Sequence, residues 1–529
     1  MIYFIPAWYN KNTWSEREQQ WYVPREKSEF DDTIKQIQLF HRSKSYEYEV
    51  ALLNYAPNFR HFLHRQSIFR APYWSCFDAI QNIRRKKVGT LSYLNLKWPE
   101  GIEFRYTPFL VAAYMDGQLY ASVDFAEDGN LIQINMYSQG KIVRTNLYDD
   151  RGFVSSTIVY ENGKPVYQDF LDEESKWKIR LVLFDGHVEV NPESAQYLLF
   201  GTNGKEQLVD YKKNSYSSID EVIYEVFRSY VGRTAGDSIF CVALHEKNII
   251  LLQDILKNRN TILTVYSDRY ELSQLSHIKE MLNNVHYIIA DSREQAIKVV
   301  ESTDIELERI LDIPPFDSRI DVGISQQINT QSIMVPIDGL DQDTFIKLIL
   351  ILNKYLNEHQ DTSVTLFTRK AGYNVCETLQ ESVSRILRLD LSQYNWGKDF
   401  DESILELNTK KHMSFEVEQC VDEASVTRCI RKQRILLDMR NVPDLYLRIA
   451  AVSTGIPQII SRHSQFVIDG KNGYRINDIK GIEGKLSYYL DNMSNWNEAQ
   501  VYSFELGEKY TTEKLLESWK EVIDSFELY

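Results

Sequence analysis

The sequence is short of cysteine, of long apolar runs and of positive charge, and each shortage excludes a class of protein. Five cysteines stand apart without CxxC spacing, so we expect neither a disulfide framework nor a metal site. No apolar run approaches the ~18 residues that a membrane span needs. The net charge of −15 disfavours general binding to nucleic acid, because such binding neutralises phosphates.

Recognisable targeting and catalytic motifs are missing as well. The start, MIYFIPAWYNKN, lacks both a basic region and a cleavage site, so we predict no signal peptide and a cytoplasmic location. The chain has no GxSxG elbow, P-loop, HExxH or EF-hand pattern. We therefore expect no cofactor.

What is present is typical of a large α/β protein. A length of 529 residues predicts two to four domains, and 43% apolar with 26% charged residues lies in the globular range. Residues 1–8 form an apolar run that predicts a buried strand of a parallel sheet. Further strands are predicted at 239–244, 261–267 and 285–291, alternating with helical patterns, as in a doubly wound sheet. A helix is predicted over 74–83 from its apolar spacing.

Between these strands the pattern changes to short strands separated by X-Gly dipeptides. The glycines recur every 11 or 12 residues, at Gly117, Gly129, Gly140, Gly152 and Gly163. Asp-Gly and Asn-Gly supply the positive φ that hairpin turns need. We predict an antiparallel meander at about 98–215, inserted into the first α/β lobe.

A second lobe is predicted after the proline pair in Ile313–Phe316, which continues neither helix nor central strand. Strands at 333–338, 363–368, 435–439 and 457–461 alternate there with helices at 345–357 and 445–452. Thr511 or Thr512 is expected to cap a final helix. The predicted segments are 1–97 and 216–313 for the first Rossmann-type lobe, 98–215 for the inserted sheet, 314–508 for the second lobe, and 509–529 for a helix packing back across the lobes.

The segment Arg440–Asp478 resembles the C-terminal lobe signature of retaining GT-B glycosyltransferases. That signature is a short helix ending in a small residue, then Gly, any residue, Pro and a buried strand, followed by a polar-Asn-Gly turn. Ala450–Ser461 and Asp469–Gly473 match it. The resemblance implies a GT-B-like pair of Rossmann-type lobes, here with an inserted antiparallel β-sheet domain.

The same resemblance implies two glutamates, eight residues apart, that face the donor sugar and its ribose. Counting back from Gly455 places them at Val442 and Ala450, whose side chains accept no hydrogen bond. Asp444 is the nearest carboxylate, but a shift of two residues turns a helix by about 200°. Asp444 is then either a substitute for the missing acid or an ordinary cap at a helix start.

The resemblance further implies an Arg and a Lys after the first strand of the second lobe, where they hold the diphosphate. The matching stretch, PIDGLDQDTF, offers Gly339 instead, surrounded by Asp338, Asp341 and Asp343. A carboxylate ~4 Å from a phosphate charge costs roughly 4 kcal/mol at an effective dielectric near 20. Lys347 is the remaining candidate cation.

Two further groups carry candidate chemistry. His245 follows the predicted strand at 239–244, at the carboxyl end where α/β sites gather, and is either a sugar contact or a structural histidine. A basic strip interleaved with aromatics is either a solvated face or a docking surface for an acidic partner or anionic lipid head groups. Its members are Arg60, Arg65, Arg70, Arg84, Arg85, Lys86 and Lys87.

Over its whole length the chain resembles the first accessory secretory protein family of the streptococcal and staphylococcal accessory Sec system. The segments IYFIPAWYN, YDDRGFVSSTIVYENGKPVYQDF, IPPFDSRIDVGISQ and RIAAVSTGIPQI carry this resemblance. It implies a cytosolic complex with two sister accessory proteins, one similar to an acetyltransferase and one to a carbohydrate-binding module. It also implies a serine-rich-repeat glycoprotein adhesin as substrate and the accessory Sec ATPase as export partner.

Two functions follow as hypotheses. The first is a non-catalytic subunit that binds and scaffolds the adhesin with the sister proteins, and that can also lie peripherally at the inner face of the membrane. The second is an active retaining glycosyltransferase that transfers a sugar from a UDP-sugar to the serine-rich adhesin. In the second case Asp444, His245 and Lys347 are the only plausible actors.

Overall fold

The structure is a computed structural model and describes residues 1–9, 13–24, 28–44, 46–200, 205–267, 269, 278–303, 305–388 and 415–526. Two compact units share the chain. Unit 1 comprises Met1–Val23, Gln36–Ile289 and Val300–Leu311, and unit 2 comprises Pro24–Lys35, Ala290–Val299 and Asp312–Tyr529. The exact boundaries at 97, 215, 313 and 508 stay predictions.

The parallel sheet of unit 1 has seven strands in the order β19-β18-β17-β16-β1-β2-β3. Its strands are β1 (Ile2–Ile5), β2 (Tyr48–Leu52), β3 (Tyr73–Ser75), β16 (Ile239–Ala243), β17 (Asn260–Val265), β18 (Tyr287–Ala290) and β19 (Ile310–Asp312). The helices between them are α1 (Asp32–Ser43), α2 (Phe59–Arg65), α3 (Cys76–Ile80), α4 (Ile219–Val231), α5 (Glu246–Gln253), α6 (Lys279–Leu282) and α7 (Arg293–Ser302). Every residue of β1 and β16 is buried, as expected for central parallel strands.

The region predicted as one helix at 74–83 contains a strand and then a helix. Tyr73–Ser75 pairs in parallel with β2 as the edge strand β3. The helix α3 begins only at Cys76, because the Ser75 hydroxyl accepts a hydrogen bond from the Asp78 N–H and caps it.

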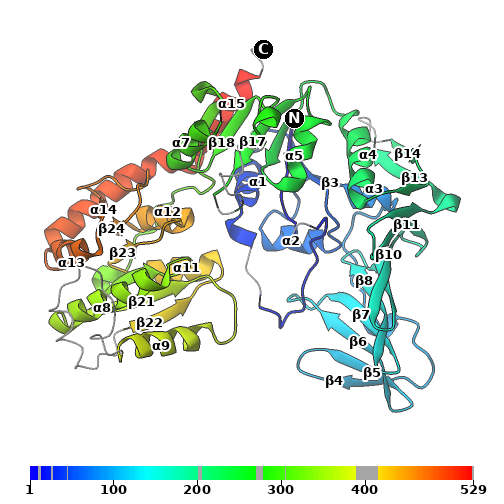
Figure 1. Cartoon of the computed structure of the whole chain (residues 1–529), viewed down its shortest axis with the longest axis horizontal. Coiled ribbons are helices and arrows are strands. Elements are labelled where there is room, and N and C mark those ends of the chain that lie inside the picture. The colour runs from blue at the N-terminus through cyan, green and yellow to red at the C-terminus, as the bar shows by residue number, and fades with distance from the viewer. Residues whose placement is uncertain are drawn as a thin grey trace. The chain divides into compact units, whose positions relative to one another are not determined.

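An antiparallel sheet is inserted between β3 and β16, as predicted. Its order is β15-β12-β11-β10-β9-β8-β7-β6-β5-β4, and Figure 1 shows β4 to β8 as neighbouring arrows in cyan. The strands are β4 (Glu103–Tyr106), β5 (Val111–Met115), β6 (Gln118–Phe125), β7 (Leu131–Ser138), β8 (Lys141–Asp149), β9 (Phe153–Glu161), β10 (Lys164–Leu171), β11 (Trp177–Val182), β12 (Val188–Val190) and β15 (Ser215–Tyr216). A separate hairpin pairs β13 (Gln196–Phe200) with β14 (Glu206–Asp210). The predicted turn glycines, from Gly117 to Gly163, all have positive φ.

A buried ion network joins the inserted sheet to the helices α2 and α3 of unit 1. The β8–β9 turn places Asp149, Asp150 and Arg151 beside α2 and α3. Arg60 of α2 donates to Asp149 at 3.0 Å and pairs with Asp150, and Arg151 donates to Asp149 and to Asp78 of α3 at 2.7 Å each. Arg60 is only 5% exposed, so its guanidinium belongs to this network and does not extend the basic strip.

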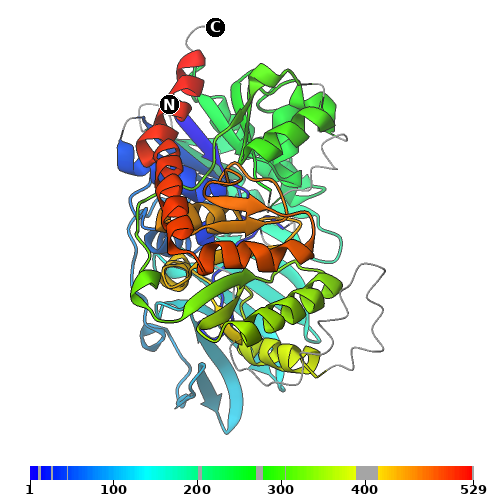
Figure 2. The ribbon, with the colours of Figure 1, turned by 90° about the vertical axis from the view of Figure 1, so that its left-hand side faces the viewer.

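Unit 2 contains a six-stranded parallel sheet in the order β22-β21-β20-β23-β24-β25. Its strands are β20 (Gln331–Pro336), β21 (Thr362–Thr368), β22 (Phe415–Gln419), β23 (Ile435–Asp438), β24 (Gln458–Ile460) and β25 (Gly473–Arg475). Its helices are α8 (Gln342–Glu358), α9 (Val375–Ile386), α11 (Glu423–Ile430), α12 (Leu445–Thr454), α13 (Ile482–Leu490), α14 (Met493–Gly507) and α15 (Thr512–Ser525). The helix α14 packs against α12 and α13 (Figure 2). The pair of Rossmann-type lobes with an inserted antiparallel sheet is therefore confirmed.

The ends of unit 2 follow their local sequence signals. The proline pair at 314–315 lies outside helix and strand, directly after β19. Thr511 caps α15 by accepting from the Lys514 N–H. The apolar stripe of α15 is buried at Leu515, Trp519, Val522 and Ile523. No helix among the described residues is both long enough and apolar enough to cross a bilayer.

Candidate functional site

Ionisable side chains gather at the carboxyl edge of the unit 2 sheet, where ligands bind in open α/β folds. Asp338 follows β20, Arg369 follows β21, Asp438 ends β23, and Asp444 stands at the start of α12. This edge is also where the GT-B resemblance places the donor. We therefore take it as the candidate site.

The carboxylate of Asp444 is fully engaged within unit 2. It caps α12 by accepting from the Leu447 N–H at 3.1 Å. Its second partner is Arg369, whose guanidinium lies 2.9 Å from Asp444 Oδ2 and stacks 3.7 Å from the ring centroid of Phe30. Phe30 belongs to the short turn Ser28–Phe30, which sequence reasoning had not connected to this lobe.

The two positions that match the missing glutamates lie on either side of this cap. Val442 precedes α12 and is 60% exposed, whereas Ala450 lies within the helix and is half-buried. The helix ends as predicted at Gly455, which has φ of 76°. A Cβ there would come within 2.7 Å of the Phe504 ring, so the αL glycine is required by both backbone and packing.

The turn after β20 is held together by its own acidic residues. Asp338 accepts from the Thr368 hydroxyl and from the Arg369 N–H, both at 2.7 Å. Asp341 caps α8, and hydrogen bonds from the Thr344 N–H and hydroxyl hold the pKa of Asp341 below its usual value. Lys347 pairs at 2.5 Å with Asp343, one turn earlier on α8. Gly339 has φ of 82°.

A second acidic group, Asp438, binds two arginines inside the sheet edge. Arg440 donates to it through Nε at 2.9 Å and through Nη2 at 3.0 Å, while Arg448 Nη2 lies 3.1 Å from Oδ2. Burial opposes ionisation of Asp438, but the charges of Arg448 and Arg440 outweigh it and keep the pKa of Asp438 below its usual value. Sequence reasoning missed this cluster, although an arginine within the apolar run LYLRIAAV was a usable signal.

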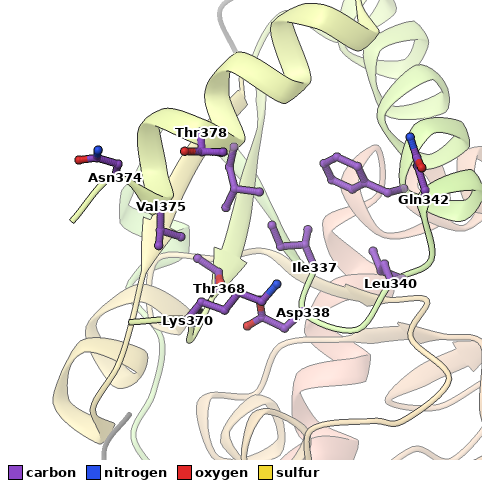
Figure 3. Close-up of a pocket in the computed structure, with 11 residues that line it drawn as sticks. Ile337, Asp338, Leu340, Gln342, Thr368, Lys370, Asn374, Val375 and Thr378 are labelled. Carbon is purple, nitrogen blue, oxygen red and sulfur yellow. Dashed lines mark hydrogen bonds between the residues drawn. The ribbon is translucent and has the colours of Figure 1, made fainter. Parts of the chain in front are cut away.

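A pocket of about 570 Å³ opens between the turn after β20, the end of β21 and the start of α9 (Figure 3). Its walls are mostly apolar, and Figure 3 shows Val375 facing Ile337 across it. Asp338 and Lys370 lie at one end. Within the part of the chain that the structure describes, they are the only ionisable residues that line it. Among these residues the pocket offers one cation, no glutamate and an aspartate that already holds a turn.

His245 lies in unit 1, directly before α5. Its ring caps α5, with Nδ1 accepting from the Lys247 N–H at 3.2 Å, and it contacts Tyr9 edge-on. Burial, followed by the nearby charges of Arg269 and Lys247, lowers the pKa of His245 to about 4. The neutral ring that results is suited to capping a helix.

The other residues of the predicted basic strip, apart from Arg60, have different surroundings from one another. Arg65 pairs with Glu18 and lies 3.4 Å from Asp128, and Arg70 is exposed. Arg84 pairs with Glu206 at 2.7 Å, the Arg85 N–H donates to Glu173 at 2.7 Å, and the Lys86 ammonium lies 5.3 Å from the Phe200 ring centroid. The exposed stretch is therefore residues 84–87 beside the β13–β14 hairpin.

Comparison with known proteins identifies the family. The family model for accessory secretory protein 1 of the accessory Sec system matches residues 1–525. A curated Streptococcus gordonii protein of that same name is 31% identical, over 99% of this chain and 100% of its own length. The crystal structure of accessory secretory protein 1, 2 and 3 in Streptococcus pneumoniae has a chain with 25% identity and a TM-score of 0.78, covering 100% of this chain and 99% of its own. The pneumococcal O-GlcNAc transferase GtfA, in complex with UDP and GlcNAc, shares the fold at 12% identity and a TM-score of 0.70, covering 99% of this chain and 98% of its own. The chain therefore belongs to the family of accessory secretory protein 1 of the accessory Sec system.

Proposed function

We propose that this chain is a non-catalytic, glycosyltransferase-like subunit of the accessory Sec system. The observation that supports it best is the state of Asp444, the carboxylate nearest in sequence to the two glutamate positions. Its oxygens cap α12 and bind Arg369, so it acts as a structural residue of unit 2. Val442 and Ala450 offer no group that stabilises a developing positive charge on a sugar.

The phosphate side of the candidate site supports the same proposal. Electrostatic stabilisation of developing charge, here the charge on a departing diphosphate, is usually the largest single contribution to catalysis. Here the turn after β20 presents Asp338 and Asp341, and the α8 cation Lys347 is paired with Asp343. Arg369 is paired with Asp444, and Arg440 is held by two hydrogen bonds to Asp438.

The partners of the chain are proposed from its family. We place it in the cytoplasm, in a complex with the two sister accessory proteins, where it binds and scaffolds the serine-rich-repeat glycoprotein and presents it to the accessory Sec ATPase.

The exposed stretch at 84–87 gives a contact with the anionic inner face of the membrane. Flotation of the full chain with phosphatidylglycerol vesicles tests that contact, which disappears at high salt and in a variant with all four residues neutralised.

The experiment for the central proposal measures UDP release from UDP-glucose and from UDP-GlcNAc. The full chain is assayed alone and with the sister proteins and a glycosylated serine-rich acceptor. We expect co-purification with the sister proteins and UDP release no faster than in buffer. The matched variant is Asp444→Asn, because asparagine caps a helix as well as aspartate but carries no charge.

Two results would contradict the proposal. One is UDP release by the wild type that is lost in Asp444→Asn while the unfolding midpoint stays the same. The other is UDP release by the wild type that is lost in Lys347→Ala or in His245→Asn. Either result would favour the active retaining glycosyltransferase.

A further inference from the structure

The outer strand of the antiparallel sheet in unit 1 is open. In the sheet order β4 stands last, and no further strand pairs with it among the described residues (Figure 1). Such an edge presents unpaired backbone groups that accept another strand. Glu103 and Arg105 are exposed on it, and Tyr106 is 69% exposed.

The pairing of β4 with β5 fixes which backbone groups point outward. The Thr107 N–H donates to the Leu110 carbonyl at 3.1 Å, so this pair is hydrogen-bonded. Since hydrogen-bonded pairs alternate in an antiparallel ladder, Arg105–Ala112 and Glu103–Tyr114 bond inward as well. The N–H and carbonyl groups of Phe104 and Tyr106 therefore face the open side.

The side chains of β4 divide between two faces. Phe104 packs against the apolar core of the inserted sheet. Glu103 and Arg105 lie together on the opposite face, and the Arg105 guanidinium rests 4.1 Å from the ring centroid of Tyr114 on β5. Two opposite charges therefore stand two residues apart, beside the outward-facing groups of Phe104.

We propose that β4 is a self-association edge, at which a second copy of this chain adds its own β4 in antiparallel orientation with Phe104 on the two-fold axis. This register opposes Phe104 to its copy as a hydrogen-bonded pair. It also opposes Glu103 of each copy to Arg105 of the other, as closely spaced non-hydrogen-bonded pairs. The interface is isologous, as a closed dimer requires.

The charges select this register over its neighbours. On β4 the backbone N–H and carbonyl groups that face the open side belong to even-numbered residues. A two-fold symmetric pairing of two β4 strands can therefore place its axis at residue 103, 104 or 105. An axis at Glu103 puts two glutamates opposite each other, and an axis at Arg105 puts two arginines opposite each other. Only the axis at Phe104 pairs opposite charges on both sides. Gly101, with φ of 89°, and Pro108 bound the pairing window and exclude longer slips.

Sedimentation velocity of the full chain alone, over a concentration series at low salt, tests the proposal. We expect a monomer–dimer equilibrium for the wild type. Glu103→Arg and Arg105→Glu should each weaken it at least tenfold, because each change creates two like-charged pairs. Mixing these two variants should restore association, since one then supplies two arginines and the other two glutamates. The double variant, which carries both Glu103→Arg and Arg105→Glu, should again associate with its own copies.

The restored samples separate charge pairing from simple damage. The double swap removes the Arg105–Tyr114 contact just as Arg105→Glu does, so a structural defect would persist in it. Hydrogen exchange provides a second readout, with the Phe104 and Tyr106 amides protected at dimer-forming concentrations and not in Glu103→Arg. A wild type that stays monomeric at every concentration, or a mixture that fails to associate, would overturn the proposal. The test uses no donor sugar or sister protein, so its outcome is independent of the proposed function.

Discussion

Two buried ion clusters, one in each unit, differ in how well their charges are matched. In unit 1 every guanidinium nitrogen of Arg60 and Arg151 has a hydrogen-bond partner, and three aspartates balance the two arginines. In unit 2 a single carboxylate, Asp438, faces both Arg440 and Arg448. Arg448 is 0% exposed, and none of its guanidinium nitrogens makes a hydrogen bond within the described residues.

The difference indicates two roles for buried charge. The matched cluster joins the β8–β9 turn to α2 and α3, and two of its three aspartates, Asp149 and Asp150, lie about ninety residues beyond Arg60. The unmatched cluster lies at the carboxyl edge of the unit 2 sheet, the edge at which open α/β folds bind ligands. A buried ion pair contributes little net stability, but removing one partner leaves an uncompensated charge. The following changes test this contrast, in order of expected effect.

The largest loss of stability is expected for Asp438→Ala, because it removes the one carboxylate that pairs with both buried guanidinium groups. Breaking one buried pair costs about 3–5 kcal/mol, and here two pairs are broken at once, so the upper end applies. Urea unfolding of the full chain, followed by tryptophan fluorescence, measures the change. The control is Asp343→Ala, which breaks the partly exposed pair with Lys347 and should cost no more than about 0.5 kcal/mol. Similar costs for both variants would remove the distinction between buried and exposed pairs.

A smaller loss, about 3 kcal/mol, is expected for Asp149→Ala in the matched cluster. Asp150 still pairs with Arg60 and Asp78 still pairs with Arg151, so neither arginine loses all of its counter-charge. Hydrogen exchange should report faster opening of the β8–β9 turn. The control Glu206→Ala breaks the exposed pair with Arg84 and should change stability by less than about 1 kcal/mol. An unchanged exchange rate at the turn would show that the network does not fix the inserted sheet.

The regular elements were predictable because their signals are local. Apolar runs located β16, β20 and β23, and X-Gly dipeptides located the hairpins, since positive φ at a tight turn depends on a few adjacent residues. Asp444 and Gly455 marked both ends of α12 through capping chemistry. A helix over 74–83 was wrong at its start, because pairing with β2 made Tyr73–Ser75 a strand.

The site could be predicted only in part, because its contacts join residues distant in sequence. The capping role of Asp444 was readable from the sequence, but its pairing with Arg369 was not, since 75 residues separate them. Arg60 resembled a member of a basic strip until Asp149 and Asp150 proved to surround it. Charge patterns along the chain do not show which charges are buried together.

A third variant, Arg448→Met, sharpens the contrast between the clusters. Methionine removes a guanidinium that makes no hydrogen bond to any described residue, and it retains an apolar side chain of similar length in the buried site. Asp438 keeps the two hydrogen bonds from Arg440. Replacing a poorly satisfied buried ion with an apolar group is often neutral, so we expect a change within about 1 kcal/mol in either direction. A loss above about 3 kcal/mol in the same urea assay would mean that Arg448 is a full partner of Asp438.

The smallest effect concerns His245, which in this structure is a half-buried helix cap rather than a charged site residue. Its folded pKa of about 4 lies below the unfolded value of about 6.5, so the unfolded chain binds the proton first as pH falls. The stabilising contribution of the neutral ring is therefore complete above about pH 6.5, declines between about 6.5 and 4, and is lost below about 4.

His245→Asn keeps a capping acceptor but does not titrate, so the wild type should lose more stability than the variant across this window. The difference between their urea midpoints from about pH 7 to about pH 4 isolates this residue, because the other histidines titrate in both proteins. If the urea midpoints of the two proteins fall in parallel with pH, the His245 ring is solvated and its pKa is the same in the folded and unfolded chain. That result would favour His245 as a sugar contact.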